Sequence, residues 1–226
     1  MNHDLSPLMT ALGYTFQDPS LLRTALTHRS YCNEVPGQTG HNERLEFLGD
    51  AILNFLAGAV AYERFPDAVE GLLTRLRAQV VCEPSLADLA REVGLGPFLR
   101  LGRGAAQGDK AAANPSILAD AFEAVVAAIC LDGGLDAARA FAGLRLAAAL
   151  DRAARIAGPG DAKTALQERC LAQWREVPRY EVLERLGPSH NPRFRVRVTL
   201  PDGRTAEAEG RSRKDAEQAA AGGVLE

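Results

Sequence analysis

The chain has 226 residues, of which 46% are hydrophobic and 24% charged, so it can bury the core of one large domain or of two modest ones. It contains no apolar run of about 18 residues and no signal-peptide pattern at its N-terminus, so we expect no membrane partner. The net charge of −3 argues against a broadly basic surface, and any nucleic-acid footprint has to be local.

The first two thirds of the chain, from Leu5 to about Ile156, has a helical pattern throughout. Turn dipeptides such as Asp18-Pro19, Pro36-Gly37 and Gly133-Gly134 divide it into helices. The polar, Gly- and Ala-rich stretch 102–115 is expected to form a loop. Segment 157–161, rich in Gly and Pro, is the best candidate for a linker between domains.

Segment 42–53 carries three acids on one helix face, because Glu43, Glu46 and Asp50 follow one another at i, i+3 and i+7. The opposite face is apolar and is expected to dock on a core; it consists of Leu45, Leu48, Ile52 and Phe55. Like charges at these spacings repel one another, which favours a cation that neutralises them.

A second acidic pair lies in segment 116–129, where Asp120 and Glu123 point away from a broad apolar face that includes Phe122. If the two helices meet edge to edge, four carboxylates converge. Oxygen ligands without His or Cys suit Mg²⁺ or Mn²⁺ rather than zinc. The alternative is that both acidic faces are simply solvated.

The C-terminal segment changes to a mixed pattern. Residues 163–174 are helical, and strands are expected at 179–186, 193–200 and 204–208, the second with strict apolar alternation. Ser212 and Asp215 form a capping box that opens a last helix. The order α-β-β-β-α predicts a small α+β domain.

Arg211, Arg213 and Lys214 crowd the start of that last helix, where the helix dipole disfavours cations. A phosphate would reverse this cost, since backbone N–H groups and cations would then act together. The alternative is an ordinary solvated run of charges.

Residues 41–53 resemble the signature segment of the ribonuclease III family, and residues 115–134 resemble its second acidic helix. The resemblance implies an all-α N-terminal endonuclease domain. It implies Glu46, Asp120 and Glu123 as metal ligands, with Glu123 bridging two ions, and Asp50 and Glu123 as catalytic residues, Asp50 holding and polarising water. Glu43 and Glu70 correspond to auxiliary acids. The cofactor implied is Mg²⁺, with Mn²⁺ able to substitute. His28 and His41 are interpreted as structural or supporting residues.

Residues 163–168, 187–190 and 210–217 resemble a double-stranded-RNA-binding domain, which reads two successive minor grooves and the phosphates between them. The resemblance implies RNA contacts from Thr164, Gln167, Glu168, His190, Arg211, Ser212, Arg213 and Lys214. Glu217 departs from the third basic position of the most basic examples, so the affinity is expected to be modest.

The sequence thus predicts a catalytic domain at 1–156, a linker at 157–161 and an RNA-binding domain at 162–226. The expected activity is two-metal hydrolysis of double-stranded RNA, giving 5′-phosphates, 3′-hydroxyls and short 3′ overhangs, with a role in rRNA or mRNA precursor processing. A non-cleaving RNA-binding regulator is the alternative, although it would lack one of the four acids. A metal-dependent nuclease for DNA or single strands is a third.

Phe47 lies beside the acidic face, and so large an aromatic side chain is not expected to face water. It either fills the core of its own chain or, as the resemblance implies, plugs a pocket on a twofold-related copy in a homodimer. No small-molecule cofactor is expected. The four scattered cysteines are interpreted as reduced core residues of a cytoplasmic protein.

Overall fold

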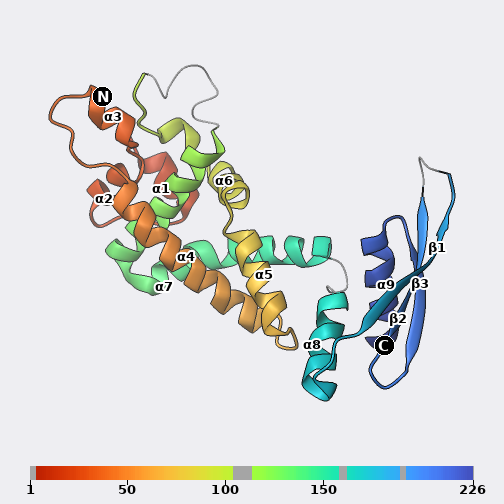
Figure 1. Cartoon of the computed structure of the whole chain (residues 1–226). Coiled ribbons are helices and arrows are strands. Elements are labelled where there is room, and N and C mark those ends of the chain that lie inside the picture. Colours follow the sequence, from red (N-terminus) through yellow and green to blue (C-terminus); the bar gives the residue numbers. More distant parts are fainter. Residues whose placement is uncertain (1–3, 104–113, 158–161, 189–191, 226) are drawn as a thin grey trace. The chain divides into compact units, whose positions relative to one another are not determined.

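The computed structural model describes residues 4–103, 114–157, 162–188 and 192–225. The chain divides into two compact units, Met1–Ala153 and Ala154–Glu226 (Figure 1). Residues 158–161 of the predicted linker, 104–113 of the predicted loop and His190 lie outside the described residues. The predictions for these positions therefore stay predictions.

The first unit is helical, as the sequence predicts, and among its described residues the only β-pairing is an isolated bridge between Thr27 and Arg100. Its elements are α1 (Ser6–Leu12), α2 (Pro19–Ala25), α3 (Arg29–Glu34), α4 (Glu43–Arg64), α5 (Glu70–Val80), α6 (Glu83–Glu92), the 3-10 helix η1 (Gly96–Phe98) and α7 (Pro115–Ala157).

Helix α7 lies at the centre of this unit. All five residues of its predicted apolar face are buried: Leu118, Phe122, Val125, Val126 and Ile129. The alanines between them are buried too, so the first half of α7 is covered on nearly every side. At Gly134 the backbone leaves helical geometry, with φ 83° and ψ 175°, and α7 is therefore two helical segments joined at the predicted Gly133-Gly134 break.

Helix α4 buries a different face from the one predicted. Leu45 and Ile52 are buried as expected, but Leu48 is only half-buried and Phe55 is 60% exposed. The buried face instead runs through Gly49, Leu53 and Leu56. The prediction for Phe55 was wrong because periodicity defines apolar faces without saying which one the protein's own core covers.

The length and hydropathy of α4 would allow it to cross a membrane, with a mean hydropathy of 1.3 in its most apolar window. Its residues Leu53, Leu56, Ala57 and Ala61 are buried within the unit, at 0–1% exposure. We therefore interpret α4 as a core helix, because core helices satisfy the same length and composition test.

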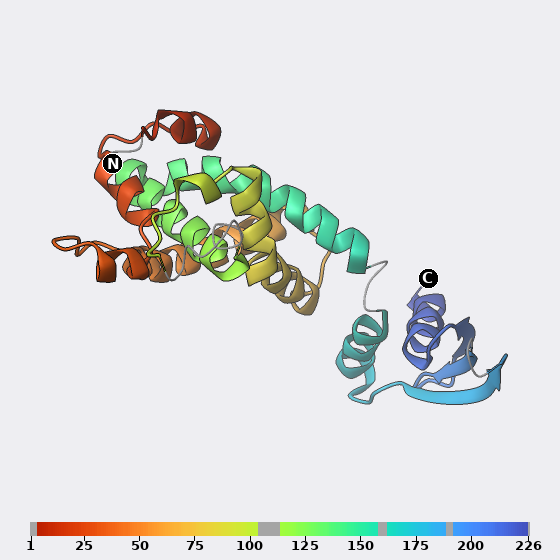
Figure 2. The ribbon, with the colours of Figure 1, turned by 90° about the horizontal axis from the view of Figure 1, so that it is seen from above.

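The second unit has the predicted α-β-β-β-α order: α8 (Ala162–Trp174), β1 (Arg179–Leu186), β2 (Arg193–Thr199), β3 (Thr205–Gly210) and α9 (Arg213–Leu225). The strands form an antiparallel sheet in the order β1-β2-β3, and both helices cover one face of it (Figures 1 and 2). The core between them includes Leu166, Cys170, Val198, Leu200 and Ala220. Here the predicted alternation in β2 is confirmed, since Val196 and Val198 are fully buried.

The cysteines are all free thiols, but they do not share one environment. Cys170 is buried, Cys32 and Cys130 are half-buried and Cys82 is exposed. The expectation that all four are core residues was therefore wrong. Cys82 lies just before α6, in a turn between helices, where the sequence pattern gave no sign of exposure.

Candidate active site and RNA-binding surface

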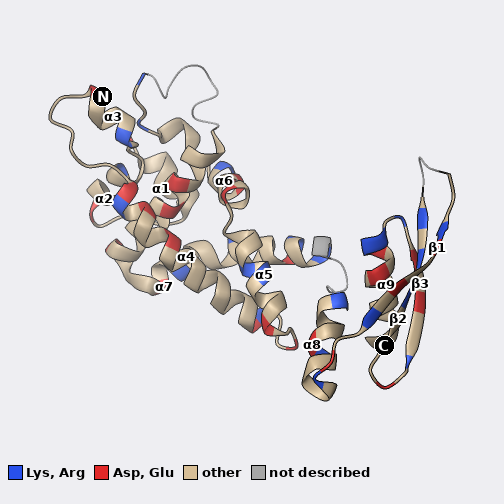
Figure 3. Cartoon of the chain, viewed as in Figure 1, with Lys and Arg blue, Asp and Glu red and all other residues tan. Residues whose placement is uncertain are grey.

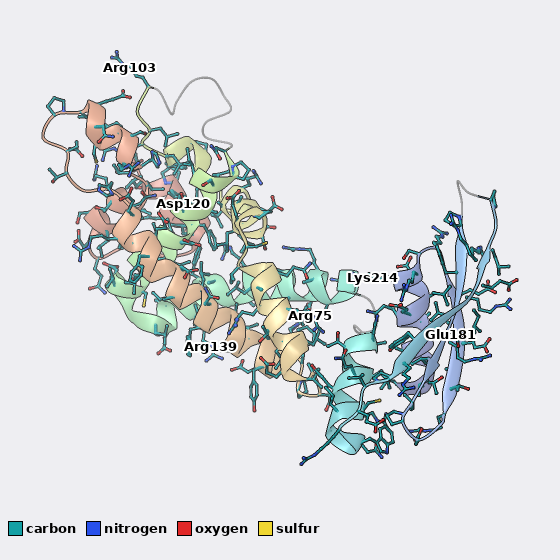
Figure 4. The ribbon with its side chains drawn as sticks, in the orientation of Figure 1. Arg75, Arg103, Asp120, Arg139, Glu181 and Lys214 are labelled. Atoms are coloured by element: carbon teal, nitrogen blue, oxygen red, sulfur yellow. The ribbon has the colours of Figure 1, made fainter. Side chains whose placement is uncertain are left out.

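The four predicted metal-site acids come together where α4 meets α7. Glu46 and Asp50 lie on α4, and Asp120 and Glu123 on α7, with Asp120 among the helices of the first unit in Figure 4. Glu46, Asp120 and Glu123 are half-buried, whereas Asp50 is exposed. The two acidic faces are therefore turned toward each other rather than both being simply solvated.

Gly49 permits this approach. A methyl group added at Gly49 would lie only 2.0 Å from the carbonyl oxygen of Glu123 and 2.4 Å from its carbonyl carbon. The backbone of α7 therefore passes directly over the turn of α4 that separates Glu46 from Asp50. The sequence did hold a signal for this contact, because a glycine inside an apolar helix weakens the helix unless close packing requires it.

The carboxylates sense one another electrostatically. Burial, followed by the charges of Asp50, Asp120 and Glu46, raises the pKa of Glu123 to about 8. Burial raises the pKa of Glu46 as well, and Asp120 and Glu43 add to that effect. The raised pKa values show that the half-buried negative charges repel one another. A bound divalent cation would relieve this repulsion.

Three neighbouring groups adjust this cluster: His28, which the sequence analysis interpreted as a structural or supporting residue, and Glu83 and Asn54, which it did not assign to the site. Burial raises the pKa of Asp120; His28 opposes that rise, and Glu83 at the start of α6 adds to it. Asn54, one turn after Asp50, donates a hydrogen bond of 2.9 Å from Nδ2 to Asp50 Oδ1. His28 caps α3, with Nδ1 accepting from the amide of Ser30.

The two predicted auxiliary acids differ in their surroundings. Glu43 begins α4, forms an ion pair with Arg29 at 3.2 Å and lies 3.8 Å from His41 Nδ1. Glu70 begins α5 and accepts a hydrogen bond of 2.7 Å from Thr74 Oγ1. Among the described residues, no hydrogen bond or ion pair joins Glu70 to the four carboxylates.

The donor set fits a hard divalent cation, since it offers carboxylate oxygens on two helices. In the described parts of the chain, however, no three His, Cys, Asp or Glu side chains already converge as a metal cage. Neighbouring carboxylates raise the pKa values of Glu46 and Glu123, but the carboxylate oxygens do not converge on one common position. A bound cation would therefore have to draw the side chains inward.

The predicted RNA-binding residues of the second unit lie on its two helices. Thr164, Gln167 and Glu168 share one face of α8, and Gln167 is exposed. At the start of α9, Ser212 Oγ accepts a hydrogen bond from the amide of Asp215 at 3.1 Å, which is one half of the predicted capping box. Lys214 marks the same end of α9 in Figure 4.

Some arginines of this unit are paired with acids, and blue and red residues are mixed along the strands in Figure 3. Arg195 binds Glu209 at 2.9 Å and Arg197 binds Glu207 at 2.6 Å, both across β2 and β3. These ion pairs neutralise two arginines of the sheet. The start of α9 gathers Arg211, Arg213 and Lys214 in four consecutive positions, which agrees with a local basic footprint in a chain of net charge −3.

Both units match known protein families. Residues 18–150 match the family model described as Ribonuclease-III-like, and residues 162–226 match the double-stranded RNA binding motif. The chain belongs to the ribonuclease III family. As such it is an endoribonuclease specific for double-stranded RNA.

Similar relatives align with this chain over most of their length. The chain is 48% identical to Ribonuclease 3 of Oleidesulfovibrio alaskensis, covering 97% of this chain and 95% of that protein. It is also 48% identical to Ribonuclease 3 of Symbiobacterium thermophilum, over 93% and 88% of the two chains.

A solved structure supports the fold of the first unit. The nuclease domain of ribonuclease III from Campylobacter jejuni is 38% identical and aligns with a TM-score of 0.58, covering 64% of this chain and 96% of that domain. It is described as having structural flexibility in a region involved in dimer formation.

Proposed function

We propose that this endoribonuclease cuts duplex RNA with divalent cations held by Glu46, Asp120 and Glu123, while Asp50 orients the attacking water. The single observation that carries the proposal is the half-buried carboxylate of Glu123, whose pKa is raised to about 8 by burial and by the three other acids. The cations, Mg²⁺ with Mn²⁺ able to substitute, would supply charge relief at phosphorus and an activated water.

We assign the remaining roles at the site to individual residues of the chain. The backbone of Glu123 contacts α4 at Gly49, next to Asp50 and one turn after Glu46, which supports Glu123 as the residue that would be shared between two ions. The hydrogen bond from Asn54 fixes one carboxylate oxygen of Asp50, which leaves the other to accept a proton from water. Glu43 and Glu70 are assigned auxiliary roles at the edge of the site.

Hydrolysis at such a site would leave 5′-phosphate and 3′-hydroxyl ends. The α-β-β-β-α unit would select duplex RNA through A-form geometry, since polar side chains such as Thr164, Gln167 and Glu168 can meet 2′-hydroxyls in the minor groove. We propose that His190, Arg211, Ser212, Arg213 and Lys214 complete that contact. Precursor rRNA and mRNA in the cytoplasm are the substrates proposed.

The active unit is proposed to be a homodimer. Phe47, Phe55 and Tyr62 form an aromatic stripe along α4 and are 82%, 60% and 74% exposed in the single chain. This excludes the alternative that Phe47 fills its own core. Exposed apolar patches of this kind are typical of interfaces, and a twofold dimer would present two sites to the two antiparallel strands of a duplex, giving short 3′ overhangs.

The substitution Glu123→Gln tests the metal site. It removes one charge and one good ligand while keeping the shape of the side chain, so it should abolish cleavage of a labelled duplex in Mg²⁺ and leave binding nearly unchanged. Glu63→Gln is the control, because Glu63 is an exposed acid of α4 paired with Arg139 and should retain cleavage. Substantial cleavage by the Glu123 variant would overturn the assignment.

A further inference from the structure

A buried acid lies inside the RNA-binding unit, away from the carboxylate cluster. Glu217 of α9 is 6% exposed and, among the described residues, is the one acidic or basic side chain that is buried. A buried charge is costly unless it is paired, so its partners are expected to matter. Both partners are basic residues near the ends of the two helices assigned to RNA contact.

Glu217 bridges these two helices. One carboxylate oxygen accepts from Lys163 Nζ at 2.5 Å, at the start of α8, and the other accepts from Arg213 Nε at 2.8 Å, at the start of α9. The next residue, Gln218, accepts the backbone amide of Lys163 at 3.0 Å. Lys163 is therefore held to α9 by both its side chain and its backbone.

The bridge is an ionised one. Burial by itself would raise the pKa of Glu217, but the hydrogen bonds and charges of Lys163 and Arg213 hold that pKa below its usual value. Two cations and one anion leave the group formed by Lys163, Glu217 and Arg213 with a net charge of +1. The buried carboxylate of Glu217 therefore neutralises one of the two positive charges, while the side chain of Arg213 is 65% exposed.

Lys214 stands in contrast to its neighbour Arg213. Both side chains are exposed, but Arg213 is paired with Glu217, whereas Lys214 forms no ion pair with any described residue. A protein cation that neutralises a phosphate releases counterions condensed on the nucleic acid, and this release drives binding. Two adjacent basic residues on the same helix turn therefore have different electrostatic environments.

We propose that Glu217 is a positioning residue that divides the basic cluster of α9. Through its bond to Arg213 it ties the start of α9 to Lys163 and α8, and it leaves Lys214 as the cation that meets the RNA phosphates. The two RNA-contacting helices thereby act as one unit. This inference rests on the proposed RNA contact of the unit and revises it at one residue, because Arg213 would then position α9 instead of meeting a phosphate.

The test compares Arg213→Met with Lys214→Met in the full-length protein. Binding of a labelled RNA duplex is measured by fluorescence anisotropy in EDTA at several salt concentrations. Lys214→Met should lower the slope of log affinity against log salt by about one unit, because one phosphate contact is lost. Arg213→Met should lower it by less than half as much. Equal losses in the two variants would overturn the inference.

A second comparison removes the bridge itself. In the Glu217→Gln background Arg213 is no longer neutralised, so Arg213→Met should now lower the salt slope by about one unit. Hydrogen exchange at the starts of α8 and α9 should be faster in Glu217→Gln and Arg213→Met than in wild type, but unchanged in Lys214→Met. Unchanged exchange in both bridge variants would contradict the positioning role.

These outcomes separate this inference from the proposed function. If the wild-type protein does not bind the duplex, the proposed RNA-binding role fails. If wild type binds and the Arg213 and Lys214 variants lose slope equally, that role stands and only the division of the cluster is wrong.

Discussion

At the scale of single residues, the proposed active site is defined by four acids that form no ion pair with any described residue. Glu123 is half-buried, and the charges of Asp50, Asp120 and Glu46 act on it. Arg29 pairs with Glu43, at the edge of the cluster, rather than with these four acids. Without a metal ion, protonation relieves their mutual repulsion, and this makes the site's stability depend on pH.

Removing the metal should make the protein less stable as pH rises. The pKa of Glu123 is about 8 in the fold against an ordinary value of 4.5, so its stabilising contribution is full below about pH 4.5 and is lost as pH rises to about 8. Thermal unfolding in EDTA should therefore show a falling Tm between pH 5 and pH 8.

Magnesium at saturating concentration should offset this fall, because the cation replaces the proton. Glu123→Gln should flatten the pH dependence in EDTA, since its amide does not titrate. If the variant kept the full pH dependence of wild type, the titration would belong to another group. Glu63→Gln serves again as the control and should behave as wild type.

At the scale of elements, the site depends on how closely α4 and α7 approach. Each helix supplies two of the four acids. The distance between the two helices is set at Gly49, where the backbone of Glu123 occupies the space that a side chain would need. This contact ties catalysis to packing, because any group added at Gly49 moves two carboxylates relative to the other two.

Gly49→Ala should reduce cleavage strongly and destabilise the first unit. The added methyl would meet backbone atoms, which cannot rotate away, and overpacking of this kind typically costs about 1–3 kcal/mol. Gly143→Ala on α7 is the matched control, since its nearest neighbour would lie at 3.9 Å. That control should be neutral or stabilising by up to about 1 kcal/mol. Full activity in Gly49→Ala would contradict the role of this contact.

At the scale of the whole molecule, α4 serves two surfaces at once. Its acids face α7, while Phe47, Phe55 and Tyr62 leave an exposed aromatic stripe. A duplex presents two strands to be cut, and a twofold dimer built on this stripe would present two sites. The same helix would thus couple assembly to catalysis.

Phe47→Ala should weaken self-association. A buried Phe truncated to Ala costs about 3–5 kcal/mol, and a symmetric interface loses the contact twice. Analytical ultracentrifugation across a dilution series should show monomer at concentrations where wild type is dimeric. Leu171→Ala in the second unit, a partly exposed apolar position, is the control. If Phe47→Ala sediments like wild type, the stripe is not the interface.

The sequence by itself determined the elements and the composition of the candidate site. The spacing of Glu46, Asp50, Asp120 and Glu123 requires only the 3.6-residue helical period, and the alternation of β2 only the two-residue strand period. Both patterns are local, so the order of helices and strands could be predicted and is confirmed by the structure.

The tertiary structure decided which faces meet. Two of its contacts join residues far apart in the chain: Gly49 with Glu123, and Glu217 with Lys163. The exposure of Phe55 depends on which face of α4 the core covers. Periodicity shows that a face is apolar or charged. It does not show whether the core, a second copy or a buried counterion will occupy that face, because this depends on long-range packing.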